Sequence, residues 1–271
     1  MTNNLSPIDR QCEFEMAPFT LVYHEGYLTS YYTSTAECPE RVKAAYSKLR
    51  DRFPVIRPEP AKLEDIYRVH SRTMVERVQL EGRDTYETAL LAAGGAIAAS
   101  EVGVRGMPAL ALLRPPGHHA GPDHYWGFCF FNNIAVAISK LMAKGSVART
   151  LVLDLDLHHG DGTENIFKDN QAVTVVNIHA KKRTTYLDSL VRELEKSAEV
   201  DLLAISVGFD TYVRDWGGVL ETDDYRTMAS AIRTAALRLC QGRLFAVLEG
   251  GYYLPDLGRN VVAFCEGLAG V

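Results

Sequence analysis

The sequence lacks the features that mark secreted and membrane-spanning chains. Its five cysteines are odd in number and form no Cys-x-x-Cys pair, which argues against a disulfide framework and a cysteine-ligated metal. The amino terminus is polar and acidic rather than basic and then apolar, so it is unlike a secretory leader. No apolar run approaches the length of a membrane span. These absences predict a cytoplasmic protein with no membrane partner.

Positive charge is also scarce. The chain has 29 lysines and arginines against 34 aspartates and glutamates, which gives a formal net charge of −5. Without a basic excess to neutralise phosphates, no nucleic-acid partner is expected. If the substrate were a histone, the positive charge would come from its tail rather than from this chain.

Internal repeats, low-complexity tracts and Ser/Gly/Pro-rich linkers are absent too. A chain of 271 residues without such a break suits a single domain over residues 1–271, in which residues 1–18 are expected to form a loosely ordered segment. The oligomeric state stays open between a monomer and a small homo-oligomer.

Short apolar, β-branched runs alternate with helical patterns along the chain. The predicted strands are 19–23, 109–113, 150–156, 172–178, 201–207 and 243–249. The predicted helices are 39–52, 63–70, 71–81, 88–102, 130–144, 164–170, 187–196, 223–240 and 255–268. This alternation predicts an α/β fold whose central parallel sheet has helices on both faces. Ligands bind such sheets beyond the carboxyl ends of the strands.

Polar residues follow four of the predicted strands, in the segments LLRPPGHHAG, LVLDLDLHHGDG, ISVGFD and VLEGGY. Asp154, Asp156 and His158 occupy alternate positions, so in an extended chain their side chains share one face. Asp210, from another strand end, is a candidate third ligand beside Asp156 and His158. Three protein ligands leave an open position for water, as in catalytic rather than structural zinc sites.

Each segment alone has a simpler interpretation. A His-His pair such as His118-His119 is most often a turn, and the EGGY segment is one as well. An aspartate at a strand end, such as Asp210, is often a helix cap, and Asp161 could cap a helix that begins near Gly162. The occurrence of all four segments in this order favours a catalytic site.

The motifs PPGHHA, GFCFFNN, DLDLHHGDGT, GFD and EGGY together resemble the family of histone deacetylases, acetylpolyamine amidohydrolases and acetoin utilisation proteins. Weaker matches include CPERVKAAY, where Cys38 replaces the usual histidine, and the segments VHS, ALLAAGGA and GRNVVAFCEGL. The resemblance covers most of the chain and implies an arginase-like α/β fold. It also implies hydrolysis of an amide, with release of an acetyl or related acyl group from an amine.

The resemblance implies a role for each matched residue. Asp156, His158 and Asp210 match the ligands of Zn²⁺, which Fe²⁺ can replace. His119 matches the general base, with the carboxylate of Asp161 behind it. His118 matches its electrostatic partner, with the carboxylate of Asp154 behind it. Tyr252 matches the hydroxyl that stabilises the oxyanion.

The resemblance also implies a potassium site and a substrate channel. The potassium ligands would come from Asp154, Asp156, His158 and Ile178, together with Asn177, where the family usually has serine. The channel would be lined by Gly127, Phe128, Trp216, Gly250 and Gly251.

The chain departs from the family pattern between His179 and Asp210. This span is shortened, and the glycine-rich loop that carries the second aromatic wall of the channel is missing. We therefore expect a shallower, more open site that admits bulky or flat substrates, with Trp216 or Tyr212 as a replacement wall. Asp84 matches, in a trimmed segment, an acid that grips the substrate backbone.

Three functions remain open at this point. The first is a deacylase that acts on acetyl-lysine, an acetylpolyamine or another small acyl-amine. The second is a weakly active or inactive relative that works by binding. The third is a two-metal ureohydrolase on the related arginase fold, which the metal stoichiometry would distinguish because that chemistry needs additional bridging ligands.

Overall fold

A parallel sheet of seven strands forms the centre of the protein. The computed structural model describes residues 19–271, so the loose order predicted for residues 1–18 lies outside it. The strands lie in the order β2-β1-β3-β7-β6-β4-β5, and every pairing is parallel. Their bounds are β1 Thr20–Val22, β2 Val55–Ile56, β3 Ala109–Ala111, β4 Thr150–Asp154, β5 Val173–Asn177, β6 Leu202–Val207 and β7 Leu244–Leu248.

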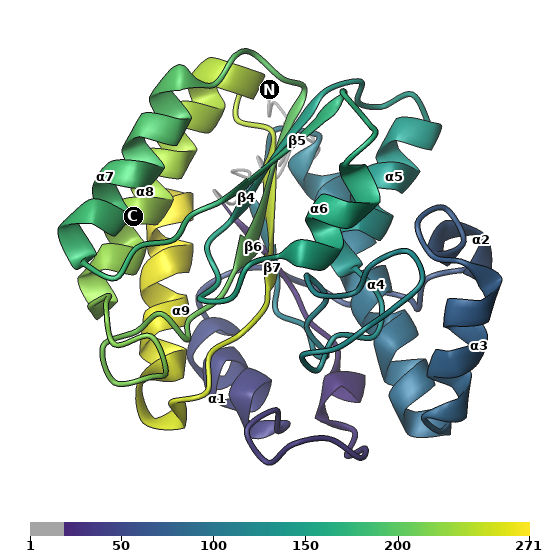
Figure 1. Cartoon of the computed structure of the whole chain (residues 1–271). Helices are drawn as coiled ribbons and strands as arrows, with labels where there is room; N and C mark the ends of the chain where they lie inside the picture. The colour runs from purple at the N-terminus through teal and green to yellow at the C-terminus, as the bar shows by residue number, and fades with distance from the viewer. Residues whose placement is uncertain (1–18) are drawn as a thin grey trace, which may run out of the picture.

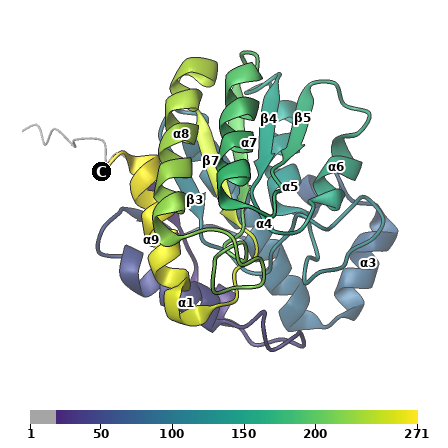
Figure 2. The same ribbon diagram turned by 60° about the vertical axis from the view of Figure 1, so that its left-hand side comes forward.

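Helices cover both faces of this sheet (Figure 1). One face carries α1 Glu40–Leu49, α7 Arg183–Lys196, α8 Thr222–Cys240 and α9 Leu254–Ala269. The other carries α4 Arg83–Gly103, α5 Asn133–Ala143 and α6 Asp161–Phe167, with α2 Leu63–Ile66 and α3 Arg72–Leu80 farther out and a short 3-10 turn at Glu25–Leu28. Figure 2 brings α8 and α9 forward and shows α9 between α8 and α1. The predicted α/β architecture is confirmed.

The central strands β4, β6 and β7 consist entirely of buried residues. This is what strands covered on both faces require, and it explains their nearly continuous apolar runs. In register, Asp154 at the end of β4 lies opposite Ser206 of β6, which lies opposite Val247 of β7. The segments that follow these three neighbouring strands therefore emerge side by side at one edge of the sheet.

Close packing of α4 depends on its two central glycines. A β-carbon at Gly94 would lie 1.9 Å from the carbonyl oxygen of Glu59, and one at Gly95 would lie 2.3 Å from the hydroxyl of Tyr27. Glycine has a low helix propensity, but at these two positions it lets the helix backbone lie close to Glu59 and Tyr27.

Several element bounds differ from the sequence prediction. The edge strand β2 was not expected, because two exposed residues give no periodic signal. The helix predicted over 63–70 is only one turn, α2, whereas α4 and α7 begin earlier than predicted, at Arg83 and Arg183. β4 ends at Asp154 rather than 156. Among the helices of residues 19–271, none is long and apolar enough to cross a membrane.

Candidate active site

Asp156, His158 and Asp210 meet at the carboxyl end of the sheet. One ligand atom from each lies within 4.8 Å of the others. His158 Nδ1 is 3.1 Å from Oδ1 of Asp156 and 3.0 Å from Oδ2 of Asp210. Asp156 and His158 lie in bends after β4, not on the strand, because Asp154 Oδ1 accepts the backbone N–H of Asp156 and Asp156 Oδ1 accepts that of His158.

The charges in this group suit the binding of a cation. The single ring N–H at Nδ1 of His158 faces both Oδ2 of Asp210 and Oδ1 of Asp156, so one donor serves two buried carboxylate oxygens. Burial and the neighbouring charge of Asp156 raise the pKa of Asp210 to about 7. Hydrogen bonds to Asp156 and Asp210 raise the pKa of His158 to about 10. Two buried carboxylates this close favour a positive partner, and an Asp/His/Asp donor set suits zinc or ferrous iron.

Two glycines give the carboxylates their space. A β-carbon at Gly208 would lie 2.1 Å from Oδ2 of Asp156. One at Gly250 would lie 2.7 Å from a carboxylate oxygen of both Asp156 and Asp210. The N–H of Gly250 donates to Asp156 Oδ2 at 2.8 Å. The glycines of the GFD and EGGY segments therefore let three strand ends converge on one point.

The two histidines of the HHA segment each have a carboxylate behind them. Nδ1 of His118 is 3.0 Å from Asp154 Oδ2, and Nδ1 of His119 is 2.7 Å from Asp161 Oδ1. Asp161 is the first residue of α6, and its carboxylate binds His119 rather than capping the helix. The structure thus brings together the two pairs that the resemblance implied, and each carboxylate orients the imidazole in front of it.

These histidines differ in proton affinity. Burial and the neighbouring His118 lower the pKa of His119 to about 4. Burial also acts against protonation of His118, but Asp154 and Asp156 outweigh it and raise the pKa of His118 well above its usual value. A neutral imidazole thus lies beside a positively charged one, a pairing that suits a base and an electrostatic partner.

Trp126 was not among the sequence-predicted site residues. Its indole lies 3.8 Å from the imidazole of His119, and its Nε1 donates to Asp161 Oδ2 at 3.0 Å. Gly127 follows at φ 60°, and a β-carbon there would lie 2.4 Å from the His119 ring. The sequence shows a tryptophan directly before the GFC motif. Nothing in the sequence separation of residues 126 and 161 predicts their contact, however.

Tyr252 occupies the opposite side of the site. Trp216 stacks on its ring at 4.0 Å, Phe128 meets it edge-on at 6.0 Å, and the guanidinium of Arg41 lies 4.8 Å from its centre. Asp215 fixes the backbone by accepting the N–H groups of both Tyr252 and Tyr253 at 2.6 Å. Burial raises the pKa of Tyr252 despite the nearby arginine, so its hydroxyl keeps its proton.

These groups surround a pocket of about 190 Å³. It is lined by Pro116, His118, His119, Trp126, Gly127, Phe128, His158, Trp216, Gly250 and Tyr252. Of the predicted channel residues, Gly251 is not in this lining; its carbonyl accepts a hydrogen bond from Arg41. Tyr212, the alternative replacement wall, is buried and donates to Asp256, so Trp216 alone takes that position. Asp84 lines a separate pocket with His24 and Pro60, away from the site.

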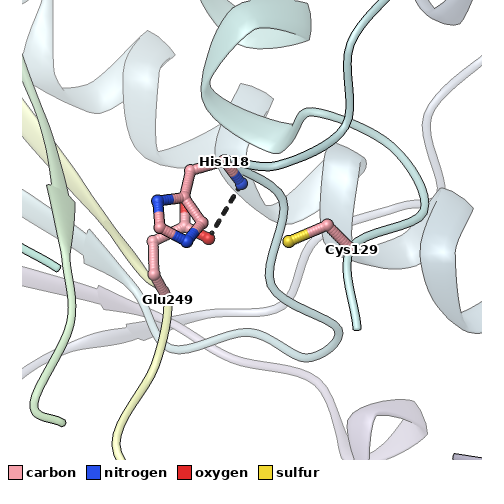
Figure 3. Close-up of side chains that lie close together, drawn as sticks. All are labelled: His118, Cys129 and Glu249. Carbon is pink, nitrogen blue, oxygen red and sulfur yellow. Dashed lines mark hydrogen bonds between the residues drawn. The ribbon is translucent and has the colours of Figure 1, made fainter. Parts of the chain in front are cut away.

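His118 also belongs to a second group of side chains that could ligate a metal (Figure 3). His118, Cys129 and Glu249 are all buried and within reach of one ion. Oε2 of Glu249 already accepts the N–H groups of Gly117 and His118, and Oε1 accepts the hydroxyl of Ser206. Burial raises the pKa of Cys129 well above its usual value, so its sulfur stays protonated. This group therefore suits a metal less well than Asp156, His158 and Asp210 do.

Three of the residues predicted to bind potassium lie together where β4 and β5 end. A β-carbon at Gly160 would lie 2.1 Å from Asp154 Oδ2, and the N–H of Gly160 donates to Asn177 Oδ1 at 2.8 Å. The N–H of Ile178 donates to the carbonyl of Asp154 at 2.9 Å. The structure thus places Asp154, Asn177 and Ile178 together where β4 and β5 end.

A second space lies beside the connection from β5 to α7. Residues 178–182 run directly from β5 to α7. A pocket of about 400 Å³ lies beside them, lined by Asp156, Leu157, His159, His179, Ala180, Lys181, Tyr186 and Thr211. The residues Leu157 and His158 therefore separate two pockets, and the side chain of His158 is 38% exposed.

Comparisons with known proteins identify the family of the chain. The family model described as "Histone deacetylase domain" matches residues 35–187. The chain belongs to the histone deacetylase family. This confirms the resemblance in the motifs, although Asp210 and Tyr252 lie beyond the matched range. Family membership supports a hydrolase activity for the chain.

Similar proteins carry deacetylase and amidohydrolase names. A "Probable deacetylase" of Methanothermobacter thermautotrophicus is 34% identical over 83% of this chain and 81% of its own length. The acetylpolyamine amidohydrolase of Mycoplana ramosa is 31% identical over 92% and 82%. The crystal structure of the HDA15 HD domain superimposes with a TM-score of 0.82 at 25% identity, covering 93% of this chain and 91% of that one.

Proposed function

We propose that this member of the histone deacetylase family is a zinc-dependent hydrolase that removes an acetyl or related acyl group from an amine. The observation that carries the proposal is the Asp156–His158–Asp210 group, in which one imidazole faces two buried carboxylates, beside the His119–Asp161 pair. Asp156, His158 and Asp210 would hold the ion. When bound, zinc polarises a carbonyl and lowers the pKa of water.

The side chains around this group suit the remaining steps. His119, neutral and held by Asp161, accepts a proton from the attacking water and later delivers it to the leaving amine. His118, charged and held by Asp154, favours the negative charge that develops on the substrate. Tyr252 keeps its proton and donates its hydroxyl to the carbonyl oxygen. Trp216 and Phe128 exclude water from the face of Tyr252.

The predicted potassium ion belongs to the same proposal. Asp154 is shared between His118 and the neighbourhood of Asn177 and Ile178. A cation there would lower the proton affinity of the carboxylate that orients His118, and so act on the rate without touching the substrate.

The deciding experiment is an acyl-amide panel with the zinc-loaded protein. Acetyl-lysine peptides, acetylated polyamines and bulkier acyl amides would be compared, with metal content measured on the same sample. Tyr252→Phe should lower kcat by about 10²-fold or more, as removal of one oxyanion donor does in other hydrolases. A folded protein that binds one zinc and hydrolyses no amide of the panel would contradict the proposal and favour a binding role. Two bound metal ions would favour ureohydrolase chemistry.

A further inference from the structure

Both tryptophans of the chain lie at the proposed catalytic pocket. The sequence contains two, Trp126 and Trp216, and both line the space of about 190 Å³ beside His158. Their side chains are 50% and 54% exposed. Large aromatic side chains left half exposed at one site usually mark a binding surface.

Each indole is oriented by a proposed catalytic residue. Trp216 stacks on Tyr252 at an interplanar angle of 21°, and Trp126 lies over His119 at 30°. A catalytic ring therefore covers one face of each indole, while half of each side chain stays accessible. The hydrogen bond from Trp126 to Asp161 fixes the plane of that indole further.

The pocket between them is walled by rings. Seven of its ten lining residues carry an aromatic ring, and the lining contains no lysine, arginine, aspartate or glutamate. Flat aromatic groups gain more from such walls than aliphatic groups of equal size, because ring–ring contacts add to simple burial.

We propose that Trp126 and Trp216 form an aromatic clamp that selects acyl amides whose amine carries a planar aromatic ring. This inference rests on the proposed hydrolase function. The carbonyl lies at the buried end, beside Tyr252 and His158, so the amine side of the amide extends toward the half-exposed indoles. The reaction itself is unchanged: oxygen from water bonds to the carbonyl carbon, the C–N bond breaks, and the amine leaves with a proton.

A matched pair of substrates tests the clamp. N-benzylacetamide and N-(cyclohexylmethyl)acetamide have the same number of heavy atoms and the same type of amine nitrogen, and they differ in the planarity of the ring. With zinc-loaded enzyme, kcat/KM should favour the benzyl compound about 5- to 20-fold, the size expected of one or two aromatic contacts. Equal values would overturn the clamp.

Variants locate the preference. Trp216→Leu and Trp126→Leu should each bring the ratio of the two kcat/KM values toward one, whereas Trp216→Phe should keep part of it. Leu237→Ala, on the exposed face of α8, is the matched control and should leave the ratio unchanged. A ratio that survives both tryptophan replacements would contradict the clamp.

Tryptophan fluorescence gives a readout that needs no turnover. Since both indoles line the pocket, adding N-benzylacetamide to metal-free protein should change the emission saturably, and at lower concentration than the cyclohexyl compound does. If the benzyl amide binds preferentially but the zinc-loaded enzyme hydrolyses neither amide, the clamp stands and the hydrolase proposal is rejected. Equal hydrolysis and equal binding of both would keep the hydrolase and reject the clamp.

Discussion

At the residue scale, His118 and His119 show how environment separates identical side chains. Both are buried and both have an aspartate at Nδ1, yet the pKa of His118 is raised and that of His119 is lowered. The difference arises because His118 faces two carboxylates, Asp154 and Asp156, which outweigh its burial. For His119, burial and the neighbouring charge of His118 outweigh Asp161, whose side chain is 40% exposed. Trp126 covers part of the His119–Asp161 pair and donates a hydrogen bond that fixes the carboxylate of Asp161.

Trp126→Phe isolates the hydrogen bond to Asp161 from the stacking on His119. The phenyl ring keeps the contact with the imidazole but donates nothing, so Asp161 holds His119 less firmly. We expect kcat to fall about five- to tenfold with little change in KM, the size of one lost hydrogen bond of ordinary net strength. Trp216→Phe is the control, because the indole of Trp216 donates no hydrogen bond within residues 19–271, and it should leave kcat closer to wild type. Equal effects of the two variants would argue against the positioning role.

His70 should make the stability depend on pH. Its Nδ1 lies 2.8 Å from the carbonyl of Gly121, and its Nε2 accepts the N–H of Asn132, so a second proton has no acceptor. Burial lowers the pKa of His70 to about 4 from 6.5. The unfolded chain therefore binds a proton first, and His70 contributes a loss of stability as the pH falls from about 6.5 to 4, up to about 3 kcal/mol.

Urea unfolding at several pH values measures this loss. His70→Gln removes the titrating group while its amide can still bond both partners, so the free energy of unfolding should depend less on pH in that window. An unchanged pH dependence in this variant would assign the loss to other groups.

At the element scale, strand ends were more predictable than the loops that follow them. Buried apolar runs identified β4, β6 and β7, and the polar residues after them identified Asp154, Asp156 and Asp210 as neighbours. The bends after β4 were not predicted, because they depend on hydrogen bonds from backbone N–H groups to aspartate side chains, such as Asp156 N–H to Asp154 Oδ1 and Leu157 N–H to Asp210 Oδ1.

The aromatic contacts of the site were the least predictable part. Trp126 meets Asp161 from 35 residues away, and Trp216 meets Tyr252 through a loop after β6. Tyr212 looked equally suitable in the sequence, but its side chain turns inward to Asp256. Such choices are made by tertiary packing, which local periodicity does not record.

Asp224 joins two helices and should stabilise both. Its carboxylate accepts the N–H of Glu221 in the capping box of α8 and two hydrogen bonds from Arg183 at the start of α7. Asp224→Ala should lower the free energy of unfolding by about 1–2 kcal/mol, mainly through loss of the cap. The neighbouring Asp223→Ala, which removes an exposed carboxylate, should cost less in the same urea titration. A smaller loss for Asp224→Ala than for its neighbour would contradict this assignment.

At the scale of the whole molecule, the metal group should link zinc binding to folding. The buried carboxylate of Asp210, beside the charge of Asp156, opposes the fold until a cation neutralises the pair. Chelation should therefore lower the Tm on the order of 5–10 °C, and stoichiometric zinc should restore it. Asp210→Asn should melt above the metal-free wild type yet respond little to zinc. A zinc response as large as that of the wild type would place the ion elsewhere.

The order of the strands has a consequence for synthesis of the chain. β7 is the last strand to be made, yet it lies between β3 and β6. Until Leu244–Leu248 has left the ribosome, β2-β1-β3 and β6-β4-β5 are two half-sheets with no shared hydrogen bonds. The same late segment leads directly to Gly250, whose N–H binds Asp156. A nascent chain therefore completes its sheet and its active site in one final step, and a chain terminated shortly before that strand would have neither.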